Sequence, residues 1–465
     1  MRSVMGRPRM VPHYDAIPFA SYEHVSDFLR DAETACILDG QPSDGTVHFD
    51  SVARSLHQLG RPDRAYRSIH ITGTNGKTTV SRMLAALLRN AGLKVGLYTS
   101  PHIGPPHHSI AIDGRPISEQ HFVDACNHIR PYLDWDGVRI SPFEFLTVAA
   151  FFAFRAARVD YAVIEVGIGG RRDATNILAP DVAVITNIAE DHLSLLGGSL
   201  TAVAREKAGI IKPFTPLVCG VSGNTPRAIV LEEAARLHAP VRLIGHDYEV
   251  GSVQMDRGTT RGSIRIGDTF WDNLILPAPA TFMLANAAHA LTAFDLLQQR
   301  SLVNTVPPDR VRQLFASMDL ADCSETVEGP PPVLLNGAHN APASAALAAT
   351  LRHAWETHDP LFVIAVHRDK DADTMLGHLA ATRPGRAIFT RCPSGLHLEP
   401  EALAVRWQTL TSAPAEVVPD PTAAIRRAIA VADRTAVVVV TGSLQLAALG
   451  RATLLTPVPS SPSRS

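Results

Sequence analysis

The sequence "IHITGTNGKTTVSRML", residues 69–84, decides the fold. An alternation of apolar and polar residues ends at Ile71, as at the end of a β-strand, and apolar residues recur at helical spacing from Val80 onward. A turn with two glycines, residues 73–76, separates the two patterns. A strand, a glycine turn and a helix together direct backbone N–H groups and a helix N-terminus at one anion. The stretch therefore predicts a loop that grips phosphate.

The residue types in this loop suit separate tasks in holding a nucleotide. The glycines let the backbone approach the phosphates, Lys77 supplies a point charge, and the hydroxyl of Thr78 or Thr79 can face a magnesium ion. The common P-loop has four residues between its glycines, whereas this loop has two. The alternative is a glycine turn with a surface lysine, but the strand and helix on either side favour ATP binding. The loop residues that we predict to bind the nucleotide are Gly73, Thr74, Asn75, Gly76, Lys77, Thr78 and Thr79.

The composition of the whole chain narrows the class of protein. Its 465 residues allow two large domains or about three ordinary ones, and 46% of them are hydrophobic, as in globular proteins. A net charge of −2 gives no basic field, so we expect no nucleic-acid partner. Five cysteines without a C-x-x-C pair indicate a reducing compartment. There is no signal-peptide core and no apolar run of about 18 residues, so we expect a cytoplasmic protein that does not bind membranes.

Strand-like and helix-like segments alternate in two separate regions of the chain. From Arg67 to about Val221, buried runs such as "YAVIEVG" and "VAVITNI" alternate with helical stretches such as 145–157. The pattern restarts beyond about residue 320 with "PVLLNG", "LFVIAV", "RAIFTR" and "AVVVVTG". Such alternation predicts an α/β fold with mostly parallel sheets. We expect one domain over residues 1–320, a second over 321–455 and a disordered tail over 456–465.

Two polar residues follow neighbouring strands and are candidates for binding magnesium. Ser100 ends the strand in "YTSPHI", and Glu165 lies where the strand in "YAVIEVGIGG" runs into glycines. In a parallel sheet both then lie at the carboxyl edge beside the phosphate loop, where ligands bind. A hydroxyl and a carboxylate are oxygen ligands suited to Mg²⁺. The alternative is a turn serine and a glutamate that is satisfied by backbone groups.

The next strand brings further polar residues to the same edge. "VAVITNIAEDH" ends in Asp191 and His192, and Lys207 follows on a helix beside Glu206. A lone histidine in a chain with 20 of them is ordinarily a surface or core residue, and a lysine beside a glutamate is ordinarily solvated. Composition alone leaves both residues without a role.

Taken together, these motifs identify a family. The chain resembles the folylpolyglutamate synthase and dihydrofolate synthase branch of the Mur ligases, and the resemblance runs from about Tyr22 to Arg451. It implies an N-terminal P-loop ATPase domain with a mostly parallel sheet and a smaller, Rossmann-like C-terminal α/β domain. The motifs that carry it are "GTNGKTT", "TSPHI", "EVGIGGRRDATN", "ITNIAEDH", "LGGSLTAVAREKAGIIK", "NGAHN", "DKD" and "TGSLQL".

The resemblance implies a reaction and a metal site. The γ-phosphoryl group of ATP would pass to a carboxylate, and an amine would attack the resulting acyl phosphate to give an amide, ADP and phosphate. In this family, residues matching Ser100 and Glu165 hold one magnesium ion. The histidine matching His192 holds a second ion, and a lysine matching Lys207, typically carbamylated, completes that second site. The implied cofactors are thus ATP and two Mg²⁺ ions.

The resemblance also implies where the substrates bind. Asn286 matches the asparagine that approaches adenine, and Asn336 lies where the family has an aspartate near the nucleotide. His339 and Ser443 match residues that hold the amino-acid substrate, by default L-glutamate, while the acid would be dihydropteroate or a folate. We expect a monomer that acts on small molecules. The residues implied to carry catalysis are Lys77, His192, Lys207 and His339.

Several family positions are different in this chain. The family arginine near the domain linker aligns with Cys323, and Arg368 is one candidate for a replacement cation. A glutamate–arginine pair after the TSPH motif aligns with His108–Ser109, so we expect weaker activity on dihydropteroate than on another acid. Three alternatives therefore stay open: a paralogous ligase for a different acid and amine, a nucleotide-binding homologue with little or no ligase activity, and a generic P-loop switch.

Overall fold

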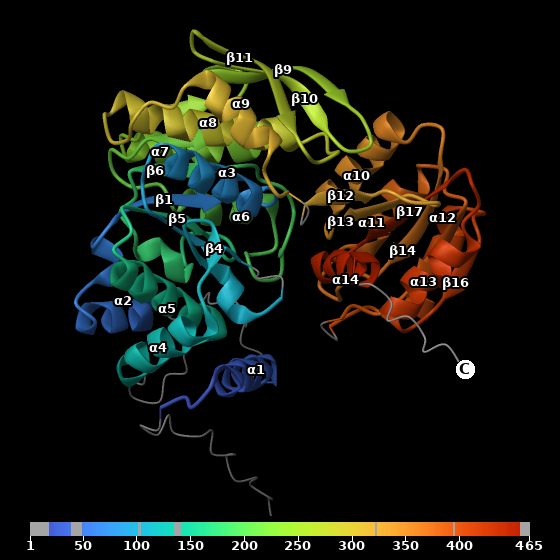
Figure 1. The fold of residues 1–465 in the computed structure, drawn as a ribbon, viewed down its shortest axis with the longest axis horizontal. Coiled ribbons are helices and arrows are strands. Elements are labelled where there is room, and N and C mark those ends of the chain that lie inside the picture. The colour runs from blue at the N-terminus through green and yellow to red at the C-terminus, as the bar shows by residue number, and fades with distance from the viewer. Residues whose placement is uncertain are drawn as a thin grey trace, which may run out of the picture.

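The computed structural model describes residues 18–38, 49–100, 104–133, 141–320, 323–393 and 396–455. Two α/β bodies lie side by side, and a small antiparallel sheet lies over the first body (Figure 1). The predicted tail, residues 456–465, lies outside the described residues.

An eight-stranded sheet forms the centre of the first body. Its strands are β1 (Arg67–Thr72), β2 (Val95–Tyr98), β3 (Ile110–Ile112), β4 (Arg115–Pro116), β5 (Tyr161–Glu165), β6 (Val182–Ile185), β7 (Leu217–Cys219) and β8 (Val241–Leu243). The spatial order is β4-β3-β2-β5-β1-β6-β7-β8, in which the pairs β2–β3 and β3–β4 are antiparallel and the other pairs are parallel. The carboxyl ends of β1, β2, β5 and β6 therefore meet at one edge, which is where ligands bind in such sheets.

Helices cover both faces of this sheet. They are α1 (Tyr22–Leu38), α2 (Phe49–Gln58), α3 (Lys77–Asn90), α4 (Glu119–Ile129), α5 (Pro142–Ala157), α6 (Leu200–Ala208), α7 (Asn224–Arg236), α8 (Met283–Gln299) and α9 (Pro308–Ala316). Successive residues of a strand point to opposite faces. Val163 of β5 accordingly packs in the core with α3 and α8, whereas Ala162 and Ile164 pack with α4 and α5.

The second, antiparallel sheet lies beyond α8. It consists of β9 (Tyr248–Met255), β10 (Thr260–Ile266) and β11 (Thr269–Leu276), in the order β11-β10-β9. Ile264 of β10 and Leu274 of β11 are buried against α8. Figure 1 shows this sheet reaching from the first body toward the second.

The C-terminal body is built on a six-stranded sheet. Its strands are β12 (Ser324–Val327), β13 (Val333–Asn336), β14 (Asp359–Ile364), β15 (Arg386–Phe389), β16 (Ala415–Val417) and β17 (Ala436–Thr441). The order is β12-β13-β17-β14-β15-β16, and within it the pair β12–β13 is antiparallel and the other pairs are parallel. The helices are α10 (Ala341–Ala354), α11 (Ala372–Ala380), α12 (Pro400–Leu410), α13 (Pro421–Val431) and α14 (Leu444–Leu455). The first three pack on one face and the last two on the other.

This architecture confirms the predicted α/β fold class with a large, mostly parallel sheet and a smaller second α/β domain. The helix expected over 145–157 begins one turn earlier, at Pro142. The reason is a capping box: Ser141 Oγ accepts the Glu144 N–H at 3.3 Å, and the Glu144 carboxylate accepts the Ser141 N–H at 2.7 Å. Within the described ranges, no helix is both long enough and apolar enough to span a bilayer.

Candidate active site

The loop between β1 and α3 requires glycine at both predicted positions. Gly76 has a φ of +83°, and a Cβ there would lie 2.4 Å from Asn286 Oδ1. A Cβ on Gly73 would lie 1.8 Å from the hydroxyl oxygen of Thr186. That hydroxyl donates to the Asn75 carbonyl at 2.6 Å, which fixes the turn against the end of β6. The two glycines thus allow close approach of backbone from two other elements.

The charged group of this loop lies over the N-terminus of α3. Lys77 is the first residue of that helix, and its ammonium donates to the carbonyls of Gly73 and Thr74 at 3.1 and 3.3 Å. Asn187 Oδ1 accepts the Asn75 N–H at 2.9 Å, so the end of β6 supports the loop. The N-terminus of α3 and the Lys77 ammonium therefore lie together at this loop, and both attract an anion.

Glu165 is buried beside the loop with one oxygen unused. Its Oε1 accepts the Thr78 hydroxyl at 3.0 Å, and its carboxylate also accepts the backbone N–H of Ser100. Among the described residues, Glu165 Oε2 has no hydrogen-bond partner. Burial raises the pKa of Glu165 to about 7, although Lys77 and Thr78 act in the opposite direction. An unpartnered carboxylate oxygen beside the Thr78 hydroxyl and the backbone of Ser100 fits a magnesium ion.

Lys207 is also buried at this edge, and it faces the phosphate loop. Its Nζ donates to the Gly73 carbonyl at 2.8 Å. Burial and the nearby charge of Lys77 lower the pKa of Lys207 from 10.5 to about 7. A substantial fraction of Lys207 is therefore neutral at neutral pH, which is the state in which a lysine amine is nucleophilic.

Residues of the two bodies meet at Asp191 and His192. Asp191 accepts from the Lys370 ammonium at 2.8 Å and from Asn340 Nδ2 at 3.0 Å. Lys370 Nζ also lies 3.3 Å from His192 Nε2, and Asp369 lies 3.5 Å from His192 Nδ1. The side chains of Asp191 and Lys370 are each only 8% exposed, so this is a buried ion pair between domains.

The pKa values in this cluster follow from burial and charge. Burial and the positive charge of Lys370 lower the pKa of His192 to about 4, so its imidazole is neutral at neutral pH. Burial opposes the ionisation of Asp191, but His192 and Lys370 outweigh it and hold the Asp191 pKa below its ordinary value. His192 has a φ of +50°, in the left-handed region that residues other than glycine seldom adopt. The cluster therefore combines an ionised carboxylate, an ammonium and a neutral imidazole.

The loops that carry the predicted amino-acid site lie together at one edge of the second sheet. β13 and β17 are parallel neighbours, and the Gly442 N–H donates to the Ala338 carbonyl at 2.9 Å across their ends. This contact joins the loop of His339 to the loop of Ser443. Burial and the charge of Lys370 lower the pKa of His339, whose Nδ1 lies 2.8 Å from the Gly337 carbonyl.

The two predicted nucleotide asparagines have different surroundings. Asn286 on α8 is buried beside Gly76, and among the described residues its Nδ2 has no partner, so it is free to contact a base. Asn336 has partners of its own: its Nδ2 donates to Ser324 Oγ at 3.1 Å, and its Oδ1 accepts the Ala338 N–H at 3.0 Å. The geometry thus makes Asn336 a support for the His339 loop.

The predicted two-magnesium set is assembled only in part. Ser100 and Glu165 meet, but His192 contacts Lys370 and Lys207 contacts Gly73. Residues 101–103 of "TSPHI" lie outside the described residues. Over the described ranges, no three His, Cys, Asp or Glu side chains form a metal site by themselves, so serine, lysine or phosphate oxygens would have to contribute.

Two cluster residues were not predicted from the sequence. Lys370 belongs to the "DKD" motif, beside which we expected Arg368 to replace the missing linker arginine. Asn340 belongs to "NGAHN". Asn340 and Asn75 exchange amide hydrogen bonds at 3.0 and 3.2 Å, so the second domain contacts the phosphate loop directly. Sequence motifs far apart in the chain gave no sign of these contacts, because they arise only when the domains pack together.

Comparison with known proteins agrees with this geometry. The family model of the Mur ligase middle domain matches residues 137–294, and that of the Mur ligase glutamate ligase domain matches residues 324–444. The dihydrofolate synthase/folylpolyglutamate synthase of Mycobacterium tuberculosis is 36% identical over 373 residues, which cover 76% of each chain. The folylpolyglutamate synthase of Lacticaseibacillus casei is 33% identical over 416 residues, which cover 86% of this chain and 92% of the relative.

Solved structures show the same fold. The Mycobacterium tuberculosis folylpolyglutamate synthase complexed with ADP superposes with a TM-score of 0.86 and 31% identity, over 94% of this chain and 99% of that one. The folylpolyglutamate synthase of Thermotoga maritima gives a TM-score of 0.78 and 27% identity, over 94% and 97% of the two chains. The chain therefore belongs to the folylpolyglutamate synthase and dihydrofolate synthase family of Mur ligases, which are ATP-dependent ligases that join an acid to an amino acid.

Proposed function

We propose that this enzyme joins L-glutamate to a pteroate- or folate-type acid, with formation of ADP and phosphate. The observation that carries the proposal is the convergence of two domains on one site. The phosphate loop of the first domain contacts Asn340 of the second, and Lys370 of the second domain pairs with Asp191 of the first. The names of the relatives supply the substrates.

The reaction proceeds through an acyl phosphate. A carboxylate is a poor electrophile, and transfer of the γ-phosphoryl group to it creates a good leaving group. The amine of glutamate then attacks the carbonyl carbon, phosphate leaves, and the amine loses a proton as the amide forms. Phosphoryl transfer depends mostly on positioning and on neutralising charge. The loop N–H groups and Lys77 hold the phosphates, and Lys370 adds a positive charge from the opposite domain.

We further propose that Ser100, Glu165 and Thr78 or Thr79 hold a magnesium ion bound with ATP. The support is the unpartnered, buried Glu165 oxygen and its contacts to Thr78 and Ser100. A divalent ion at this place would neutralise charge on the β- and γ-phosphates during transfer. Its positive charge would also offset the effect of burial, which raises the Glu165 pKa.

Lys207 is proposed to become a carbamate and, with His192, to complete a second ion site. Carbamylation needs a neutral amine, which attacks CO₂ and releases one proton. The lowered pKa of Lys207 supplies that amine at neutral pH. The reaction converts a cation into an oxygen ligand. Lys207 would then bind the metal ion in place of the Gly73 carbonyl, and His192 would bind it in place of the Lys370 ammonium.

Residues of the second domain are proposed to hold glutamate. His339 and Ser443 stand on neighbouring loops at the carboxyl edge of the second sheet, with Asn336 supporting the first loop. We assign residues 1–320 to the ATP-binding domain and 321–455 to the amino-acid domain, since β12 begins the second sheet at Ser324. We also propose that the protein is a monomer and that it lies in the cytoplasm, where ATP is available as the substrate.

One observation favours a different acid. The 3₁₀ turn Pro106–Ser109 places Ser109 in the interior, where its hydroxyl donates to the Pro106 carbonyl at 2.8 Å, and His107 is buried against Tyr22. Ser109 therefore cannot bind the substrate carboxylate as a family arginine would. A paralogous ligase for another acid is accordingly the second candidate function.

ADP release, measured over a panel of acids with glutamate and other amino acids, separates these candidates. The first candidate function predicts the highest kcat/KM with a pteroate- or folate-type acid and glutamate, whereas the loss of the family arginine at Ser109 predicts a better acid of another class. A better acid of another class would establish the paralogous function. A protein that binds ADP but releases none with any pair would contradict both.

A further inference from the structure

A partly open cavity lies on the first domain, away from the phosphate loop. Its volume is about 530 Å³, and it lies between the β3–β4 hairpin and helices α4 and α5. Lys94, the residue before β2, is on its rim, whereas Ser100 follows the other end of β2. Six extended residues span about 20 Å, so this cavity is separate from the candidate active site. Its size is within the range of small-molecule sites.

Apolar side chains from the β3–β4 hairpin and from α5 line the bottom of this cavity. The hairpin side supplies Ile112 and Ile117, and α5 supplies Phe152 and Ala153. Ala156 continues the α5 surface by one turn, and these alanines leave room where larger side chains would fill the space. An apolar slot of this kind favours a flat ring system, because burial of apolar surface is the main source of affinity there.

The rim of the cavity is predominantly basic. Lys94, Arg115 and His121 stand around it. Among the ion pairs of the described residues, none involves the side chain of Lys94 or of Arg115. The acidic residue on the rim is Asp124, whose Oδ1 already accepts from Gln120 Nε2 at 2.9 Å. Two unpaired cations beside an apolar slot are complementary to an amphipathic anion.

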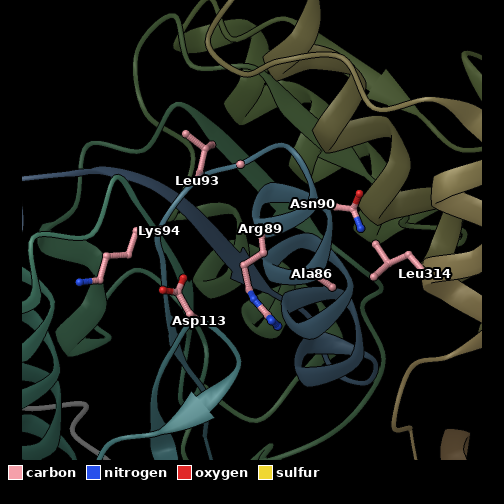
Figure 2. Close-up of a pocket in the computed structure, with 8 residues that line it drawn as sticks. Ala86, Arg89, Asn90, Leu93, Lys94, Asp113 and Leu314 are labelled. Atoms are coloured by element: carbon pink, nitrogen blue, oxygen red, sulfur yellow. The ribbon is translucent and has the colours of Figure 1, made fainter.

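A neighbouring cavity differs from this one in the charges that line it. It has a volume of about 660 Å³, and Arg89, Asn90, Asp113 and Leu314 line it (Figure 2). Arg89 and Asp113 are opposite in charge, so this cavity does not select for an anion. Lys94 borders both cavities, but Figure 2 shows its ammonium pointing away from Arg89 and Asp113.

From these features we propose that the cavity between the hairpin and α5 binds a small aromatic carboxylate. One or two fused rings lie between Ile112 and Phe152, and the carboxylate is held by Lys94 and Arg115. This site is independent of the proposed ligase reaction, since none of these residues belongs to the phosphate loop or to the domain cleft.

The test uses calorimetric titration of the full chain with 1-naphthoate, in the presence of saturating ADP. Lys94→Glu reverses one rim charge, and Ala156→Phe fills the slot from an exposed position of α5. Arg352→Glu, an exposed charge reversal on α10 of the other domain, is the matched control. The uncharged 1-naphthamide is the matched ligand, and unchanged ADP affinity verifies the fold of each variant.

We expect naphthoate to bind the wild type and Arg352→Glu equally, and Lys94→Glu about tenfold more weakly, as the loss of one charged contact predicts. Ala156→Phe should abolish binding, and the amide should bind about tenfold more weakly than the acid. Absence of measurable naphthoate binding, or equal binding by Lys94→Glu, would overturn the proposal. Equal affinity for the amide and the acid would also overturn it.

Discussion

Replacement of Lys370 by methionine should open the domain cleft and disable amide formation. The ammonium is 2.8 Å from Asp191, and both side chains are 8% exposed. Removing one partner of a buried ion pair costs about 3–5 kcal/mol. Asn340 still donates to Asp191 at 3.0 Å, so we place the cost at the low end. About 3 kcal/mol corresponds to roughly a hundredfold in an equilibrium constant.

The assay is ADP release, with kcat/KM for glutamate and the dissociation constant of ADP measured separately. Lys370→Met should lower kcat/KM about a hundredfold, while ADP affinity changes little because Lys370 does not contact the phosphate loop. The double variant with Asp191→Asn should recover part of the loss, since no uncompensated charge stays buried. Arg406→Met, which breaks the exposed pair with Asp373 on the same domain, is the control and should have no effect.

The double-mutant cycle decides whether the reasoning holds. If Lys370 acts through Asp191, the coupling free energy should exceed about 1 kcal/mol. Strictly additive effects of the two substitutions would refute the role of this ion pair in closing the cleft.

Four further predictions concern the phosphate edge of the first sheet. Gly76→Ala should weaken ADP binding at least tenfold, because the new Cβ would lie 2.4 Å from Asn286 Oδ1. Gly92→Ala is the control: Gly92 has a similar φ of +90°, but a Cβ there would have no neighbour within 4 Å, so ADP affinity should be unchanged. Binding of MgATP at pH 6.5 should release protons from Glu165, whose pKa is about 7. Calorimetry in buffers of different ionisation enthalpy should show a smaller proton release in Glu165→Gln than in the wild type. Lys207→Ala should be inactive and regain ADP release with added formate or acetate. Because the pKa of Lys207 is lowered to about 7 from 10.5, the folded protein binds fewer protons than the unfolded chain between these pH values. The thermal midpoint of the wild type should therefore rise, relative to that of Lys207→Met, as the pH increases from 7 toward 10.

The fold was largely readable from the sequence, because its strands are buried on both faces. Runs such as "AVVVVT" in β17 cannot occupy a half-exposed position, and their alternation with helices specifies a parallel sheet. The start of α5 was missed by one turn because Phe145 begins the apolar pattern, whereas the capping box at Ser141 begins the helix. Apolar periodicity reports the buried face of a helix and not its cap.

The sequence predicts the site residues that follow the ends of strands, but it does not predict those that come together only where the two domains meet. Glu165 and Ser100 lie at the carboxyl ends of the adjacent parallel strands β5 and β2, as the alternation of strands and helices predicts, while their role as metal ligands stays a prediction. Lys370 and Asn340 reach the first domain through loops of the second, and no periodic pattern encodes such packing. For Asn336, the resemblance pointed to the nucleotide, while its hydrogen bonds are to Ser324 and Ala338.

The central claim is an acyl phosphate, and oxygen transfer tests it most directly. The acid substrate is labelled with ¹⁸O in the reacting carboxylate, and the enzyme converts it with MgATP and glutamate. Mass spectrometry of the inorganic phosphate should find one ¹⁸O atom for each amide formed, with unlabelled ADP. Label appearing in AMP, or phosphate without label while amide accumulates, would contradict the account.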